Sequence, residues 1–213
     1  MPSVVLQLPS RDQIKPNNEK DPLPFYFKPT TGWLYRHRLQ MGLDLLPPGG
    51  RRILEVGVGS GILVPTLTRH YSHYTGTDLV LAEGLQNLVH PNCHAKFQTA
   101  DLLDPSTLPS AAFDAIVCFS VLEHIRDSDG AARSLAHALA PGGTLITGYP
   151  MVSPVMTKAF QVIGYEGIDE DHVAPPAQIA RALSMVLRPG PRVAFPPYAP
   201  VKIALYQCTA WVH

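Results

Sequence analysis

Glycine is concentrated in one short segment that could bind an anionic ligand. The run Gly57-Val58-Gly59-Ser60-Gly61 follows the apolar segment Arg52–Val56 and precedes a segment, Ile62–Tyr71, with a helical pattern. Glycine lets the backbone turn tightly and approach a ligand closely, and a helix start offers unpaired N–H groups to an anion. Such a loop could bind a pyrophosphate or a carboxylate, or be no more than a tight turn.

Three carboxylates accompany this glycine loop near the ends of apolar runs. Glu55 precedes the first glycine, Asp78 lies 78 − 57 = 21 residues after it, and Asp101 follows a third run. A carboxylate at the end of a second strand can accept hydrogen bonds from both hydroxyl groups of a ribose. The glycine spacing is G-x-G-x-G, with Ile62 where a dinucleotide fingerprint has its third glycine. This spacing counts against an NAD-dependent dehydrogenase, the main competitor at the level of fold.

The segments that would position these residues alternate in type along the middle of the chain. The predicted strands are Arg52–Val56, Tyr74–Thr77, Ala95–Gln98, Ala115–Phe119 and Thr144–Thr147, and the predicted helices are Ile62–Tyr71, Leu81–Val89 and about Ser128–Leu139. Alternation of strands and helices at this spacing predicts a parallel sheet with right-handed crossover connections.

Both ends of the chain are less regular than the middle, and most of the 22 prolines lie there. Residues 1–29 are predicted to form a polar arm punctuated by proline. Residues 30–46 are predicted to form a helix with Leu34, Met41 and Leu45 on one face.

The C-terminal residues predict a change of strand direction. A weaker helix, Ala177–Val186, precedes the apolar runs Val193–Phe195 and Val201–Val212, which are joined by a proline-rich turn. Two strands that follow each other closely with a turn between them predict an antiparallel hairpin at one edge of the sheet.

Taken together, the central segments resemble the class I S-adenosylmethionine-dependent methyltransferases over about residues 50–149. The resemblance rests on segments in family order and spacing: Leu54–Gly61, Gly76–Leu79, Ala100–Leu102, Phe113–Cys118, Val121–Ile125 and Leu139–Leu145. The segment Val121–Ile125 is typical of the branch that methylates small molecules, including quinone-pathway O-methyltransferases. The family fold is α/β, with a doubly wound, Rossmann-like, seven-stranded and mostly parallel sheet that ends in an antiparallel C-terminal hairpin.

The resemblance implies a division of the chain after its arm. Residues 30–213 would form a single methyltransferase domain. Within it, residues 30–48 would be a lid-like helix, residues 50–149 the cofactor-binding core, and residues 150–213 the acceptor side and the closing hairpin.

The resemblance also implies which residues hold the methionine part of S-adenosyl-L-methionine, which the reaction converts to S-adenosyl-L-homocysteine. The glycine loop would pack against this part of the cofactor. Glu55 would orient its amino group, directly or through water. The backbone of Phe119 and Ser120 would border the same amino group.

The nucleoside part has its own implied partners. Asp78 would bind the ribose, and Leu79 would lie against the adenine ring. Asp101 would accept a hydrogen bond from the adenine amino group, while the N–H of Leu102 would donate to the ring. The implied cofactor-binding set is therefore Glu55, Gly57, Gly59, Gly61, Asp78, Leu79, Asp101, Leu102, Phe119 and Ser120.

Three histidines are candidates for a general base, which is needed only if the acceptor arrives protonated, as a phenol or an alcohol does. His124 follows the fourth predicted strand, His172 follows the fifth, and His37 lies on the N-terminal helix. Each also has a purely structural interpretation: a hydrogen bond beneath the site for His124, a loop cap for His172 and an exposed helix face for His37.

The acceptor site is predicted to lie in the variable segments Phe25–His37 and Tyr149–His172. Both are apolar and aromatic, and their tyrosines Tyr35, Tyr149 and Tyr165 are candidates for substrate contacts. Such a lining suits a small hydrophobic or aromatic acceptor. The same residues could instead serve core packing, and the sequence leaves open whether oxygen or nitrogen receives the methyl group.

No metal is expected at the site. Ser120 occupies the position at which metal-dependent catechol-type methyltransferases carry an acidic ligand. The other groups of potential ligands, His70–His73 and His90–His94, are predicted to lie on helix ends and loops away from the glycine loop, so a zinc site is not expected there.

Composition limits the partners. The 17 Lys and Arg balance 17 Asp and Glu, which counts against a dedicated nucleic-acid binder. Three cysteines do not form a disulfide framework, and no apolar run reaches the roughly 20 residues of a membrane span.

We therefore expect a cytoplasmic enzyme, monomeric or homodimeric, with a small-molecule acceptor. The alternatives are a methyltransferase acting on RNA or protein and a non-catalytic cofactor-binding partner subunit.

Overall fold

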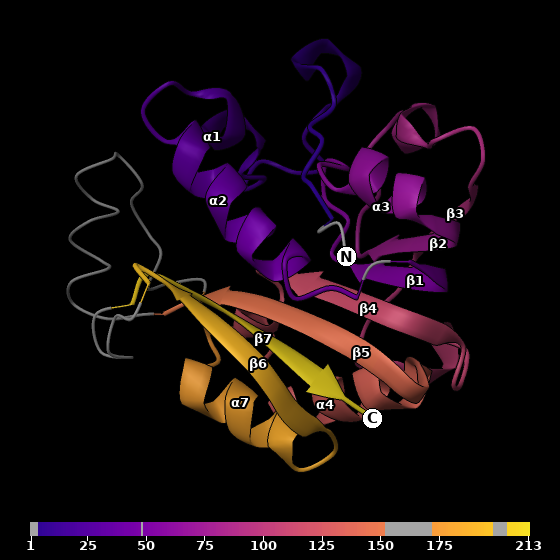
Figure 1. The fold of residues 1–213 in the computed structure, drawn as a ribbon, viewed down its shortest axis with the longest axis vertical. Helices are drawn as coiled ribbons and strands as arrows, with labels where there is room; N and C mark the ends of the chain where they lie inside the picture. Colours follow the sequence, from indigo (N-terminus) through magenta and orange to yellow (C-terminus); the bar gives the residue numbers. More distant parts are fainter. Residues whose placement is uncertain (1–3, 48, 152–171, 198–203) are drawn as a thin grey trace.

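A seven-stranded sheet forms the centre of the computed structural model, which describes residues 4–47, 49–151, 172–197 and 204–213 (Figure 1). The strands are β1 (Gly50–Val56), β2 (Tyr71–Asp78), β3 (His94–Thr99), β4 (Phe113–Phe119), β5 (Leu139–Pro150), β6 (Arg188–Phe195) and β7 (Tyr206–Val212). Their order across the sheet is β3-β2-β1-β4-β5-β7-β6.

The strand directions confirm the predicted fold class. The first five strands pair in parallel, whereas β7 is antiparallel to both β5 and β6. The strand order reverses between β1 and β4, and in open sheets of this type ligands bind outside the carboxyl ends of the strands at that point.

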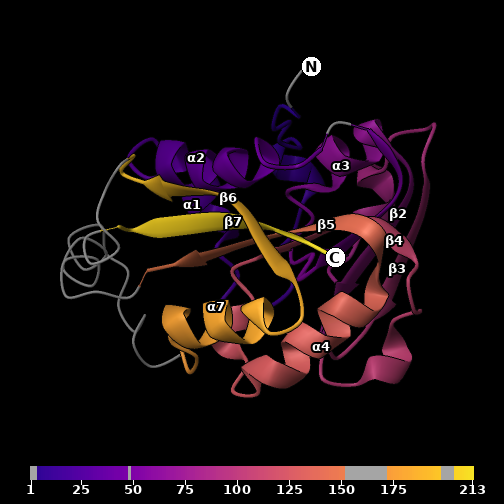
Figure 2. The same cartoon turned by 60° about the horizontal axis from the view of Figure 1, so that its bottom comes forward.

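Helices cover both faces of the sheet (Figure 2). One face carries α1 (Leu23–Phe27), α2 (Gly32–Leu43) and α3 (Val64–His70), and the other carries α4 (Ser128–Ala138) and α7 (Pro176–Ser184). Short 3-10 turns are η1 (Arg11–Gln13), η2 (Leu85–Leu88), η3 (Pro105–Thr107) and η4 (Leu122–His124). Within the described residues, no helix is long and apolar enough to cross a membrane.

Alternating side chains of the central strands fill two hydrophobic cores. Ile53 of β1 belongs to the core beneath α2 and α3, while the next residue, Leu54, belongs to the core beneath α4 and α7. Val117 and Ile116 of β4 divide in the same way. Successive strand residues point to opposite faces, so a strand covered on both sides reads as a continuous apolar run.

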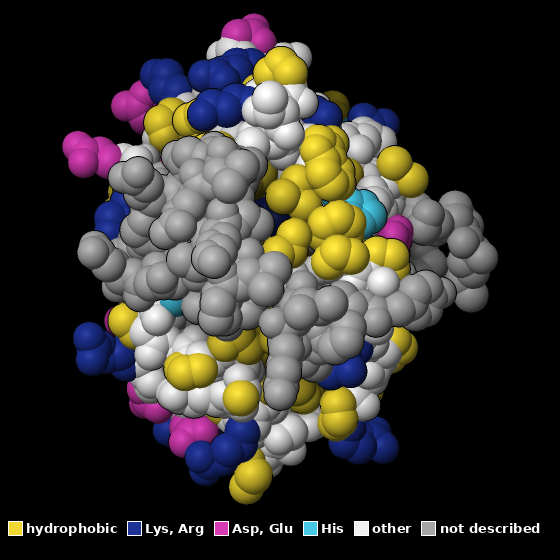
Figure 3. Space-filling view, turned by 90° about the vertical axis from the view of Figure 1, so that its left-hand side faces the viewer, with side chains coloured by type: hydrophobic (Ala, Val, Ile, Leu, Met, Phe, Trp, Pro, Cys, Tyr) yellow, Lys and Arg dark blue, Asp and Glu magenta, His cyan; other side chains and the backbone are white. Residues whose placement is uncertain are grey.

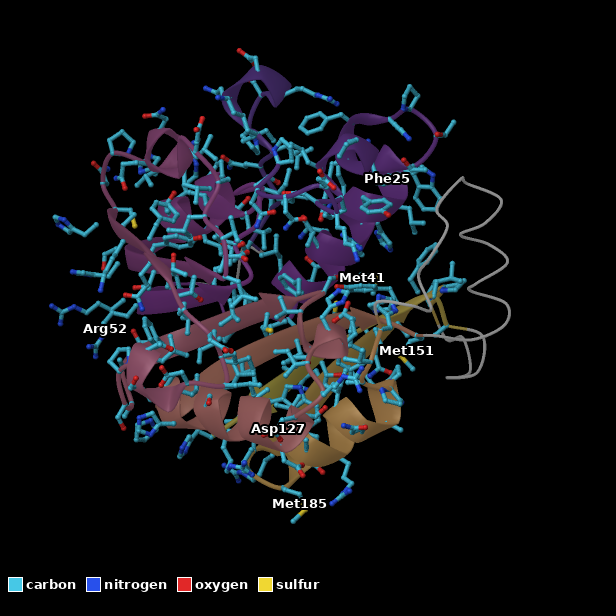
Figure 4. All side chains as sticks on the ribbon, turned by 180° about the vertical axis from the view of Figure 1, so that it is seen from behind. Phe25, Met41, Arg52, Asp127, Met151 and Met185 are labelled. Carbon is cyan, nitrogen blue, oxygen red and sulfur yellow. The ribbon has the colours of Figure 1, made fainter. Side chains whose placement is uncertain are left out.

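Helix α2 shows a different buried face from the predicted one. Tyr35, Leu39 and Leu43 are buried at four-residue spacing, whereas Leu34 and Leu45 are only half-buried. Met41 was predicted correctly as buried, and it packs on Tyr206 and Cys208 of β7; Figure 4 labels it on α2, on the side toward the sheet. More than one side of α2 is buried because the helix contacts α1 as well as β5, β6 and β7.

Two predicted helices were too long. The segment predicted as Leu81–Val89 forms only the turn η2, which follows Gly84 in the left-handed backbone region (φ 79°). The helix predicted as Ile62–Tyr71 begins at Val64, with proline in its first turn, and Tyr71 already belongs to β2. Proline is favoured at helix starts because it has no N–H to pair there.

The N-terminal arm packs against the rest of the chain. Val4 and Ile14 are buried, and the Gln40 side chain pairs with the arm through the Leu6 N–H and the Val4 carbonyl, both at 2.9 Å. Farther along, Asn17 Nδ2 donates to the Val80 carbonyl at 3.0 Å. The arm therefore runs from α2 to the loop that follows β2.

Candidate functional site

A cavity of about 1160 Å³ lies at the carboxyl ends of the parallel strands. Its walls come from the ends of β1, β2 and β4, from the turn η4, from α2 and from arm residues 17–22. Asp127, labelled in Figure 4 just before α4, also lines it, whereas Arg52 lies near the start of β1, away from it. The topology thus places the cavity where β1 and β4 diverge.

The glycine loop forms one wall because its backbone adopts conformations that other residues avoid. Gly57 and Gly59 have φ values of 79° and 50° and line the cavity. A Cβ atom on Gly57 would lie 2.3 Å from Cγ2 of Val121, so this position tolerates only glycine without a shift. Gly61 also has a positive φ but packs against Leu85 and Leu88 instead of lining the cavity.

The predicted acidic residues all reach the same end of the cavity. Asp78 accepts a hydrogen bond from the Gly59 N–H at 2.8 Å, which fixes the carboxylate beside the loop. Asp101 accepts one from the Leu103 N–H at 2.9 Å. Leu79, Leu102, Phe119 and Ser120 line this region too.

Glu55 is the buried acid of this group. Its side chain accepts a hydrogen bond of 2.6 Å from the Tyr74 hydroxyl. Burial raises its pKa to about 8, more than the Tyr74 hydrogen bond lowers it. Glu55 is therefore largely protonated at neutral pH until a cation is placed beside it.

Arg38 provides a buried positive charge at the other side of the cavity. Its guanidinium lies 4.3 Å from the centre of the Tyr35 ring and 5.5 Å from that of Tyr206, and Nη2 donates to the Tyr26 hydroxyl at 3.0 Å. Nε has no hydrogen-bond partner, and no carboxylate of the described residues lies within ion-pair distance of Arg38. A buried cation of this kind can receive an anionic ligand.

Three side chains converge next to Arg38. The donor atoms of Glu123, His124 and His172 lie within 4.8 Å of one another, and the two imidazole rings are 5.2 Å apart. The N–H groups of Val173 and Ala174 donate to the Glu123 carbonyl at 2.9 and 3.0 Å, which brings the chain around His172 to η4. The three groups are close enough to act together on one bound ligand or ion.

Glu123 differs from its neighbours in its burial. It is 2% exposed, and neither carboxylate oxygen has a hydrogen-bond partner within the described part of the chain. Burial raises its pKa to about 8, although the charge of Arg38 acts in the opposite direction.

A family model described as a methyltransferase domain matches residues 34–188 of this chain. The chain belongs to this methyltransferase family. Its methyl donor is S-adenosylmethionine, which the predicted glycine loop and carboxylates had indicated.

Curated relatives and solved structures agree with this assignment. A ubiquinone biosynthesis O-methyltransferase of Xylella fastidiosa (strain M23) is 32% identical over 155 residues, which cover 64% of this chain and 61% of that protein. The chain thus matches about three fifths of that relative's length. An uncharacterized methyltransferase of Mycobacterium tuberculosis (strain ATCC 25618 / H37Rv) is 34% identical over 104 residues, covering 47% of this chain and 51% of that protein.

The fold matches that of the N-methyltransferase NodS from Bradyrhizobium japonicum WM9 in complex with S-adenosylhomocysteine. The TM-score is 0.63 at 20% identity, over 92% of this chain and 93% of NodS. A geranyl diphosphate methyltransferase gives a TM-score of 0.64 at 14% identity, over 83% of this chain and 77% of that one. These likenesses show the methyltransferase fold.

Some of the predicted catalytic and substrate residues lie elsewhere in the methyltransferase. The imidazole of His37 packs on Phe195 at 5.1 Å and lines a shallow outer groove with Trp33, which is 53% exposed. Figure 3 shows the side of the molecule that carries α1 and α2, where hydrophobic side chains are exposed. Tyr149 is buried in the core beneath α4 and α7 and does not line the cavity, whereas Tyr35 does. Tyr165 lies outside the described residues.

Arg38 and Glu123 line the cavity but were not among the predicted site residues. Glu123 belongs to the family segment Val121–Ile125, in which only the neighbouring His124 was predicted to act. Arg38 stands in a polar run, yet it lies three residues after Tyr35 and one before Leu39, on the side of α2 that is buried. If Tyr35 and Leu39 are assigned to the buried face of α2, Arg38 lies next to that face and becomes a candidate cavity residue.

The two groups of potential metal ligands from the sequence lie apart from this site. His73 and His94 stack with ring centres 5.3 Å apart on neighbouring strands. Among the described residues, neither group brings three ligand atoms together.

Proposed function

We propose that this methyltransferase transfers the methyl group of S-adenosylmethionine to an oxygen or nitrogen of a small, hydrophobic or aromatic metabolite. The observation that carries the proposal is one cavity lined by two chemically different groups of residues. The glycine loop, Asp78 and Asp101 form the first group, and Arg38, Glu123 and the two histidines form the second. Its volume of about 1160 Å³ exceeds that of most single-ligand pockets, so a cofactor and a small acceptor can bind together.

The residues present suit both the charged methionine end of the cofactor and its uncharged ribose. Glu55 and the glycine-loop backbone would take its amino group and methionine chain, and Asp78 would take the ribose hydroxyls. Arg38 would pair with the methionine carboxylate, because its Nε is buried without a partner and lines the same cavity. The cofactor supplies the reactive chemistry, an electrophilic methyl group on a sulfonium.

The chain's own part in the reaction is to orient the acceptor and exclude water. Tyr26, Tyr35 and Leu39 give the acceptor end an aromatic and apolar wall, which suits a flat ring. Arm residues 17–22 cover part of the cavity. Positioning of this kind can supply on the order of 7–11 kcal/mol of the barrier reduction.

His124 and His172 remain base candidates for an acceptor that arrives protonated, since both line the cavity. The acceptor class also agrees with two similar proteins, whose names specify ubiquinone biosynthesis and geranyl diphosphate. Both names refer to small molecules.

The proposal is tested by incubating the protein with S-adenosylmethionine and separate sets of phenols, catechols, amines, transfer RNA and peptides. Mass spectrometry would detect the methylated product. We expect methylation of at least one aromatic hydroxyl or amine. Methylation of RNA or peptide alone would contradict the small-molecule acceptor, and cofactor binding with no product in any set would favour a non-catalytic partner subunit.

A further inference from the structure

The cavity contains a buried carboxyl group that no described residue satisfies. Glu123 is 2% exposed and lines the cavity, and neither of its carboxylate oxygens has a hydrogen-bond partner among the residues that the structure describes. Leaving a buried polar group unpaired costs about 1–3 kcal/mol, and more if the group is charged. A cost of this size is retained where a ligand supplies the missing partner.

The backbone holds this carboxyl group rigidly. Glu123 lies in the turn η4, directly after β4, and its carbonyl accepts two hydrogen bonds from Val173 and Ala174. The backbone of Glu123 is therefore anchored by a strand end on one side and by the segment before α7 on the other. Fixed groups of this kind are suited to hold a reacting atom in place.

The surroundings allow Glu123 to take up a proton and pass it on. Burial raises the pKa of Glu123 to about 8 despite the charge of Arg38, and a base with a pKa near the operating pH is suited to accept and release a proton. The nearby Tyr206 hydroxyl and Cys118 thiol stay neutral, because burial raises their pKa values. His124, which is exposed, and His172, which is half-buried, lie within 4.8 Å of it and reach toward solvent.

We propose that Glu123, rather than either histidine alone, is the catalytic base for a hydroxyl acceptor, and this proposal rests on the proposed function. The acceptor's O–H bond breaks and its proton goes to a Glu123 oxygen. The acceptor oxygen bonds to the methyl carbon, and the sulfur keeps the electron pair of the broken S–C bond. Protonated Glu123 then loses its proton to solvent water after the product leaves.

The test compares two acceptors that differ in their need for a base. Catechol is protonated at about pH 7, since simple phenols ionise near pH 10, whereas 4-nitrocatechol is largely ionised there. Glu123→Gln keeps the size of the side chain but cannot accept the proton. We expect its kcat on catechol to fall by about 10²–10⁴-fold, and its kcat on 4-nitrocatechol to fall by less than about threefold. Asp129→Asn, a change at an exposed residue that does not line the cavity, is the matched control and keeps both rates.

Binding supplies a second readout that does not depend on activity. By calorimetry, S-adenosylhomocysteine should bind Glu123→Gln within about twofold of wild type, which also shows that the variant folds. Catechol should bind the S-adenosylhomocysteine complex of Glu123→Gln about tenfold more weakly than that of wild type. The conservative variant Glu123→Asp should recover part of the catechol rate.

Three results would overturn the proposal. Equal losses on both acceptors would make Glu123 a structural or positioning residue. Loss of wild-type activity in EDTA, restored by Mg²⁺ or Mn²⁺, would place a cation among the three side chains in place of the transferred proton. If the wild type binds S-adenosylhomocysteine but methylates only amines, the role of Glu123 as a catalytic base is overturned, while the wider proposed function stays intact.

Discussion

At the residue scale, the chemistry of this methyltransferase depends on charged side chains that are buried. Glu55, Glu123 and Arg38 all line the cavity; the two glutamates are almost fully removed from solvent, and Arg38 is half-buried with its Nε atom inaccessible to solvent. A buried charge is costly unless a partner or ligand meets it. Each of these three side chains therefore leads to a separate prediction about the group that binds beside it in the cavity.

Arg38 is expected to determine affinity for the carboxylate of the cofactor. Replacing it with methionine should weaken binding of S-adenosylmethionine and S-adenosylhomocysteine by about 10–100-fold, the worth of a hydrogen bond to a charged group. Binding of 5′-methylthioadenosine, which has no carboxylate, should change by less than about threefold. Calorimetry measures both, with the exposed Arg36→Met as control. Equal losses for all three ligands would assign Arg38 to packing.

Glu55 is expected to make stability depend on pH. Its folded pKa of about 8 lies above the usual value of 4.5, so the folded state holds a proton that the unfolded state releases. Its contribution is fully present below pH 4.5 and is lost as the pH rises to about 8. The effect is of the order of a few kcal/mol. The unfolding free energy of wild type relative to Glu55→Gln, measured in urea, should therefore fall over this range. A constant difference would contradict the assignment.

At the element scale, the parallel strands were predictable and the helices less so. Continuous apolar runs such as Ala115–Phe119 match strands that are buried on both faces. The prediction of a helix after β2 was wrong because Gly84 takes a left-handed conformation, which helix propensities do not reveal. The prediction of which face of α2 is buried was wrong because α1 and the arm cover positions that would otherwise be exposed. Such contacts between distant segments leave no periodic signal.

The glycine loop gives the clearest expectation at this scale. Gly57→Ala places a methyl group 2.3 Å from Val121 Cγ2 at a φ of 79°, so strain and overpacking add to about 2–5 kcal/mol of destabilisation. Gly142→Ala has a similar φ of 74° but meets nothing within 4 Å, so it should cost only about 1–2 kcal/mol. Chemical denaturation measures both. Similar losses in the two variants would show that Val121 moves aside freely.

At the scale of the whole molecule, the arm connects the two halves of the cavity. Asp21 accepts hydrogen bonds from the Leu23 N–H at 2.8 Å and the Asn17 N–H at 3.1 Å, and it approaches the Ser60 hydroxyl at 3.4 Å. A second link joins Lys15 to Glu83 on the surface at 2.9 Å. The sequence indicated only a polar arm, because its contacts depend on where β2 and α2 place their loops.

Asp21 is therefore expected to slow release of the cofactor. Asp21→Ala should increase the dissociation rate of S-adenosylhomocysteine by about three- to tenfold, since it removes two backbone hydrogen bonds of the covering segment. The exposed Asp12→Ala serves as control. Stopped-flow fluorescence would measure the rates, and an unchanged rate in Asp21→Ala would show that the arm does not retain the cofactor.

The residues of the proposed cofactor site were easier to find in the sequence than those of the proposed acceptor site. Glycines and strand-end carboxylates such as Asp78 and Asp101 are determined by local sequence around each strand. The proposed acceptor site is lined by residues from α2, η4 and the segment before α7, which are distant in sequence. Tyr149 illustrates the difficulty, because a strand residue can point to either face, and its side chain points into the core.

The most direct measurement is calorimetric binding of S-adenosylmethionine to wild type and to Asp78→Ala, with the exposed Asp129→Ala as control. The structure places the Asp78 carboxylate 2.8 Å from the Gly59 N–H, beside the glycine loop. We expect micromolar binding to wild type and to the control, weakened at least about tenfold in Asp78→Ala, a change of about 1.4 kcal/mol. No binding to wild type, or equal binding to all three proteins, would contradict a cofactor site in this cavity.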